Sequence, residues 1–262
     1  MNRIAKSWGL ESMSEIAFKF SDMVQEVQTF EAVAKQFLDE SASSVLAQYR
    51  QQLQYIQSSK TRKPEPWSIS QNRPLKTAVS KGRYEAGQRC GRLSVFATIS
   101  TRWEICCRVE KGKKNVSPKY FHLTGLASTS VKFFSIGAEG EEELLSVWQA
   151  DIGDAESPGC HFHIQVQRED EQMPYPRTFP VPRFPSLLTS ALAVAEFAIS
   201  EIFQSEWSFS ASAHSSDLIK WSKIQRERME KLLGWQQTIV KNSLGSPWTS
   251  LKGQKPDNEL FV

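Results

Sequence analysis

The change of hydrophobic period along the chain constrains the fold most strongly. Between Leu93 and Gln167 apolar and polar residues alternate, which is the period-two pattern of strands with one apolar face. On either side of this region the apolar residues recur every three or four positions, as in helices. We therefore predict an α+β fold, with an antiparallel β-sheet over about residues 92–167. An N-terminal helical hairpin or long helix and two C-terminal helices complete it.

The predicted organisation has four parts. Residues 1–59 are an N-terminal helical arm, 60–91 a basic linker or loop, 92–245 the α+β core domain and 246–262 a C-terminal tail. The boundaries follow changes in composition, because proline and glycine interrupt regular structure in the second and fourth segments. A hydrophobic content of 40% excludes a disordered chain.

Residues 14–58 carry a regular apolar stripe at helical spacing, and neither proline nor glycine interrupts it. The cluster Asp39–Ser43 can divide the segment, since aspartate and serine cap helices better than they extend them. Two interpretations stay open for the stripe. It packs on the sheet that follows, or helices 14–58 bind a protein partner or a second copy of the chain as a coiled coil.

Residues 60–92 are strongly basic, with nine Lys and Arg against two Glu. Together with Trp67 and a second basic turn, they suit phosphate backbones and base stacking. The candidate nucleic-acid-binding residues are Lys60, Arg62, Lys63, Trp67, Arg73, Lys76, Lys81, Arg83, Arg89, Arg92, Lys113 and Lys114. The plainer interpretation is a solvated connection, because no nucleic-acid-binding motif accompanies these residues.

His161 and His163 lie two residues apart on the polar side of a predicted strand, which we expect to face solvent or a cleft. Two imidazoles so placed can share a metal ion, with Glu196 as a candidate third ligand. Asp151, Asp154, His122 and His214 are the other candidates for that third position. Two ordinary polar histidines are the alternative.

The cysteines and the apolar run 187–203 indicate which cell compartment we expect for the chain. Four cysteines, two of them adjacent, fit neither a disulfide framework nor a paired zinc site, so we expect reduced thiols in a cytoplasmic protein. The apolar run 187–203 contains Glu196 and Glu201, which argues against a membrane span.

The sequence favours a non-enzymatic interaction or assembly component of an intracellular multi-protein complex. Such a protein would touch DNA or RNA through basic loops 60–92 and 111–114, and it would need no cofactor. The alternative is a metal-dependent hydrolase or oxygenase that uses His161 and His163 with a divalent transition metal. Phosphate-binding loops and nucleophile elbows are missing from the sequence.

Overall fold

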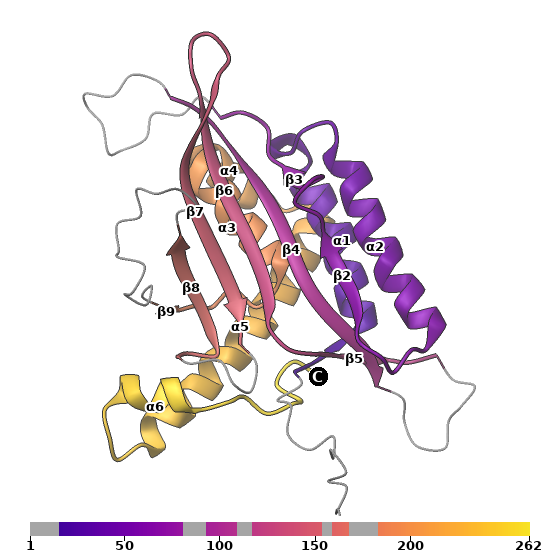
Figure 1. Cartoon of the computed structure of the whole chain (residues 1–262), viewed down its shortest axis with the longest axis vertical. Coiled ribbons are helices and arrows are strands. Elements are labelled where there is room, and N and C mark those ends of the chain that lie inside the picture. The colour runs from indigo at the N-terminus through magenta and orange to yellow at the C-terminus, as the bar shows by residue number, and fades with distance from the viewer. Residues whose placement is uncertain (1–15, 81–92, 109–116, 154–158, 168–182) are drawn as a thin grey trace, which may run out of the picture.

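The computed structural model describes residues 16–80, 93–108, 117–153, 159–167 and 183–262. Within these residues the chain forms two layers, with one antiparallel sheet in front and the helices behind it in Figure 1. The predicted α+β fold is confirmed.

The sheet is built around β4, which spans Ser94–Arg108 and forms one continuous strand. The strand order is β1-β5-β4-β6-β7-β8-β9, with β2 and β3 also paired to β4. The other strands are β1 (Ala17–Lys19), β2 (Glu65–Ile69), β3 (Leu75–Lys76), β5 (Tyr120–Leu123), β6 (Ala127–Ile136), β7 (Glu142–Ile152), β8 (Phe162–Gln167) and β9 (Phe184–Pro185).

The helices come in an N-terminal and a C-terminal group. They are α1 (Phe20–Ala34), the short 3-10 helix Lys35–Phe37, α2 (Ala42–Ser59), α3 (Ala191–Phe203), α4 (Ser205–Ala211), α5 (Ser216–Asn242) and α6 (Pro247–Gly253). Serine side chains cap α3 and α5, because Ser190 Oγ accepts from Ala193 N and Ser215 Oγ from Leu218 N, both at 3.1 Å. Residues 17–59 form a helical hairpin preceded by a short strand.

The core lies between the sheet and the helices, and large aromatic side chains dominate it. On β4 the residues Ile99, Trp103 and Ile105 point into this core. Trp67 of β2 stacks on Tyr49 of α2 with ring centroids 4.3 Å apart, and its indole N–H donates to the Tyr49 carbonyl at 2.9 Å. The alternation along β4 therefore sorts its residues onto a helix-covered face and an open face.

The N-terminal helices belong to this core. Their apolar stripe, from Ile16 to Ile56, is buried against the chain's own sheet and C-terminal helices. The stripe therefore packs within the chain, as the first of the two interpretations predicts, and a coiled coil with another subunit stays a prediction. A partner would have to bind the outer surface of these helices.

Two of the predicted boundaries also change. The segment predicted as a basic linker contains β2 and β3, which pair with β4. Proline at position 66 is tolerated because β2 lies at an edge of the sheet. The predicted C-terminal tail contains α6, and Phe261 near its end is 5% exposed and packs on Phe18 and Phe162. In the described part of the chain, no helix is long and apolar enough to cross a membrane.

Candidate binding site on the open face of the sheet

The strand predicted around His161 and His163 is present as β8, but the face on which the histidines lie differs from the prediction. His161 and His163 are 4% and 2% exposed, so the expectation that both imidazoles face solvent or a cleft is wrong. Val166, from the apolar side of the same strand, is 42% exposed. Alternation identifies which residues share a face of a strand, and packing of the neighbouring segments decides which face is covered.

The structure does not bring His161, His163 and Glu196 together. Glu196 lies on α3, which packs on the helix-covered face of the sheet, and its carboxyl group is near Trp221. His163 lies on the opposite face, because the preceding residue, Phe162, belongs to the core between the sheet and the helices. Among the described residues, no group of three or more His, Cys, Asp or Glu is arranged to hold a metal ion.

His163 instead belongs to a buried polar cluster with Asp151. Its Nδ1 lies 2.8 Å from the Cys160 carbonyl oxygen, and its Nε2 lies 3.4 Å from Asp151 Oδ2. The Asp151 carboxylate also accepts from the amides of Gln149 at 3.1 Å and Gln165 at 3.0 Å. Each of these buried polar groups therefore has a protein partner, and the cluster joins β7 to β8.

The same face carries a row of polar side chains that crosses the sheet. The strand registers pair Ser68 with Arg102, Arg102 with Ser128, Ser128 with Asp151, and Asp151 with His163. Directly opposed residues on neighbouring strands lie about 4.5–5.5 Å apart. The register therefore places an arginine, two serines and the buried Asp151–His163 pair in one line.

Part of this row lines a cleft of about 660 Å³. In Figure 1 no described helix crosses this front face of the sheet. Hydroxyl and amide residues from four strands, the β2–β3 turn and the β5–β6 turn supply most of the polar lining: Ser68, Ser70, Gln71, Ser100, Thr124, Ser128, Ser130 and Gln149. Arg102 and Glu104 are the charged residues on the β4 part of the lining. The cleft has the volume of an ordinary ligand site.

Arg102 decides what this cleft can bind. Its side chain is exposed, and among the described residues it forms no hydrogen bond or ion pair. A guanidinium presents N–H donors in a fixed fork that matches the oxygens of carboxylates and phosphates. The surrounding hydroxyls can donate to the same oxygens. The arrangement therefore suits an anionic, oxygen-rich ligand.

The structure separates the predicted basic residues into groups. Arg62 and Lys63 are exposed beside the C-terminal end of β4, where the Thr61 carbonyl accepts from Cys107 N at 3.0 Å. Lys60 adjoins them and is half-buried at the end of α2. These three residues lie next to the Pro66 and Glu104 end of the cleft.

The other candidates are more scattered. Lys76 lies toward the opposite end of β4, forms an ion pair with Glu142 at 3.4 Å, and stands 4.0 Å above the ring of Phe96. Arg73 is exposed and donates to Ser44 Oγ at 2.8 Å. Trp67 is fully buried, so its prediction as a base-stacking residue is wrong. The remaining candidates lie outside the described residues: Lys81, Arg83, Arg89, Arg92, Lys113 and Lys114.

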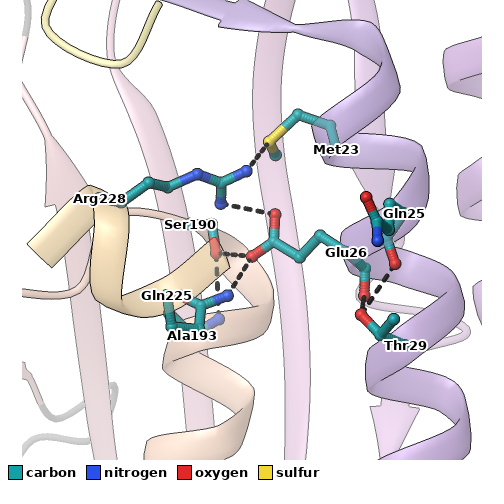
Figure 2. Close-up of polar contacts among 8 residues, drawn as sticks. All are labelled: Met23, Gln25, Glu26, Thr29, Ser190, Ala193, Gln225 and Arg228. Carbon is teal, nitrogen blue, oxygen red and sulfur yellow. Dashed lines mark hydrogen bonds and ion pairs between the residues drawn. The ribbon is translucent and has the colours of Figure 1, made fainter. Parts of the chain in front are cut away.

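A second polar cluster lies in the core and ties three helices together (Figure 2). Glu26 of α1 is fully buried; its Oε2 accepts from Arg228 of α5 at 2.7 Å, and its Oε1 from Gln225 at 2.8 Å and from Ser190. Arg228 is 6% exposed, and its second terminal nitrogen lies 3.0 Å from Met23 Sδ. Since every strong contact is internal, this cluster is a structural one.

The sequence analysis assigned no role to Arg102, Glu26 or Arg228. Glu26 interrupts the apolar series of α1 between Met23 and Val27, and Arg228 occupies the same helical stripe as Trp221. A charge within an apolar stripe could have identified the buried pair. Nothing in the local sequence distinguishes Arg102, because its position depends on strand pairing.

Comparison with known proteins identifies no relative: no family model, curated protein or solved structure matches the chain.

Proposed function

We propose that this chain is a non-enzymatic component of an assembly and that it binds single-stranded nucleic acid along the open face of its sheet. The observation that carries the proposal is Arg102, which stands exposed in a cleft of about 660 Å³ lined by hydroxyl and amide groups. Phosphate oxygens would accept hydrogen bonds from its guanidinium.

The distribution of charge along β4 favours an extended polyanion over a small carboxylate. Lys76 pairs with Thr98, which precedes Arg102 by four residues, so the two cationic positions lie about 13 Å apart along the strand direction. Arg62 and Lys63 lie beyond Arg102 at the other end of the cleft. Proteins that bind single strands without sequence preference combine such a basic track with aromatic side chains on which the bases stack. In this cleft the hydroxyl and amide groups would supply the base contacts instead.

The basic sequence of residues 81–92 and 109–116 adds support of a different kind. In sequence, residues 81–92 precede β4 and residues 109–116 follow it. Both segments lie outside the described residues, and in sequence each carries more Lys and Arg than Asp and Glu, a composition that suits a polyanionic ligand. The metal-dependent hydrolase or oxygenase gains no comparable support, because His163 and Glu196 lie on opposite sides of the sheet.

The direct test is the affinity for a fluorescently labelled single-stranded oligonucleotide, measured by anisotropy over a range of salt concentrations. Arg102→Ala is expected to weaken binding about tenfold, the loss expected for one charge-assisted contact. It should also reduce the slope of log affinity against log salt by about 0.7. Arg226→Ala is the matched control, since Arg226 is equally an exposed arginine but lies on α5, behind the sheet.

Glu104, a carboxylate in the same cleft, supplies a test in which binding should become tighter instead of weaker. Glu104→Gln removes a carboxylate from the lining and should tighten oligonucleotide binding. Absence of salt-dependent binding by the unmodified protein would refute the proposal. Equal losses for Arg102→Ala and Arg226→Ala would refute the site.

A further inference from the structure

A second cleft, of about 290 Å³, lies on the helical side of the molecule between the start of α1 and the middle of α5. Its described lining is rich in positive charge, with five cationic side chains and two carboxylates. The cationic residues are Lys19, Lys220, Lys223, Arg228 and Lys231, and the acidic ones are Asp22 and Glu227. This cleft is separate from the proposed nucleic-acid site, because α5 lies behind the sheet in Figure 1.

Arg228 is the fixed element of this cleft. The chain's own packing holds its guanidinium, which donates to Glu26 at 2.7 Å and contacts Met23 Sδ (Figure 2). The guanidinium also lies 5.6 Å from the ring centre of Phe18. At 6% exposure the side chain has little freedom to move. A guanidinium has more N–H donors than these contacts use, so donors remain for a bound group.

The lysines of the cleft are only loosely neutralised. Lys220 and Lys223 form ion pairs with Asp217 and Glu227 at 3.6 and 3.9 Å, and all four side chains are well exposed. Such surface pairs contribute little free energy. Lys231 donates to the carbonyl of Val262 at 3.0 Å.

We infer that this cleft binds a small, free phosphate-bearing ligand. Cations gathered in a concave site repel one another and focus the electrostatic potential, so a bound polyanion relieves that repulsion. Phosphate oxygens match both the guanidinium and the ammonium groups that line the wall. A volume of about 290 Å³ lies at the lower end of the range for small-molecule sites, so it accommodates a phosphate or diphosphate group and favours a small ligand over a macromolecule.

Inorganic pyrophosphate is the probe, titrated by calorimetry into the full chain in buffered potassium chloride at physiological ionic strength. Lys223→Ala and Lys19→Ala should each weaken its binding at least fivefold. Lys241→Ala removes an exposed lysine from the last turn of α5, outside the cleft, and should leave the affinity unchanged. Glu227→Gln should strengthen binding. Arg228 stays in place, because its removal would disturb the core.

Absence of pyrophosphate binding at millimolar concentration would overturn the inference, as would equal affinities for Lys223→Ala and Lys241→Ala. Sedimentation with vesicles that contain phosphatidic acid, abolished by Lys223→Ala, would overturn the assignment to a free ligand. The oligonucleotide affinity of Lys223→Ala should match that of the unmodified chain, so this inference and the proposed nucleic-acid site can fail independently.

Discussion

Two arginines on opposite faces of one sheet show how the molecule divides its charged residues. Arg228 is 6% exposed behind the sheet, where Glu26 holds it at 2.7 Å. Arg102 is exposed on the open face and has no partner among the described residues. A buried arginine contributes through the packing and pairing around it, whereas an exposed, unpaired one is available to a ligand.

The two faces differ because the described helices cover one of them and leave the other open (Figure 1). On the covered face, apolar side chains exclude water and the Glu26–Arg228 pair needs complete internal hydrogen bonding. On the open face, serine and glutamine side chains remain available to solvent or to a ligand. The comparison predicts that substitutions behind the sheet change stability and that substitutions on the open face change binding.

Arg228→Ala should have the largest effect on stability. It leaves the buried carboxylate of Glu26 without its cation, which costs about 3–5 kcal/mol when one partner of a buried pair is removed. Chemical denaturation monitored by tryptophan fluorescence measures the loss. Arg226→Ala, two residues away and exposed, should change the free energy of unfolding by less than about 0.5 kcal/mol. If Arg228→Ala and Arg102→Ala lowered the free energy of unfolding equally, the predicted difference between the two faces would be wrong.

Asp151→Ala should have an intermediate effect, because it tests a buried polar part of the open face. The substitution leaves the amides of Gln149 and Gln165 without their acceptor. Unsatisfied buried donors cost about 1–3 kcal/mol, measured by the same denaturation experiment. A variant as stable as the unmodified chain would mean that this cluster does not hold β7 to β8.

Glu196→Gln should have a smaller, pH-dependent effect. Burial raises the pKa of Glu196 above its ordinary value of 4.5, the Trp221 hydrogen bond lowers it, and the nearby Glu26 carboxylate raises it. The folded chain therefore holds a proton that the unfolded chain loses, so stability falls as the pH rises from about 4.5 through the raised pKa.

Glutamine stays neutral and avoids this loss. The variant should gain stability relative to the unmodified protein toward neutral pH, and the gain should vanish below about pH 4.5, where both states are protonated. Thermal unfolding across the pH range measures it. A stability difference that does not change with pH would contradict the predicted burial of this carboxyl group.

The smallest effect concerns the adjacent cysteines, which point to opposite faces. Cys107 is buried behind the sheet and donates to the Ile56 carbonyl at 3.2 Å; burial, together with the neighbouring Cys106, raises its pKa to about 11. Cys106 is half-buried on the open face. At pH 8 iodoacetamide should modify Cys106 first and reach Cys107 only after unfolding, as peptide mass spectrometry would show. Equal rates would contradict the assignment of faces.

Local pattern in the sequence predicts the strands and helices well, because each period depends on a few neighbouring residues. The alternation of Arg102 and Glu104 with Trp103 and Ile105 already defines two faces of β4. It does not reveal which strands lie beside it. The row that joins Arg102 to Ser128 and Asp151 exists only after residues far apart in sequence pair in one register.

Strand β8, which carries His163, also shows that local sequence does not reveal which residues become neighbours. Its period was predicted, but the burial of His163 depends on partners such as Asp151 and on the Cys160 carbonyl. The Glu26–Arg228 pair joins residues that lie 202 positions apart, so no local pattern could reveal that the two would meet.

The most direct test of the central claim compares two leucines of nearly equal exposure. Leu126 lines the open cleft at 44% exposure, and Leu233 lies on α5 at 45%. Hydroxyl-radical footprinting with and without a single-stranded oligonucleotide would report their accessibility together. Binding on the open face should protect Leu126 and leave Leu233 unchanged. Protection of Leu233 alone, or of neither residue when the oligonucleotide is bound, would contradict the proposed site.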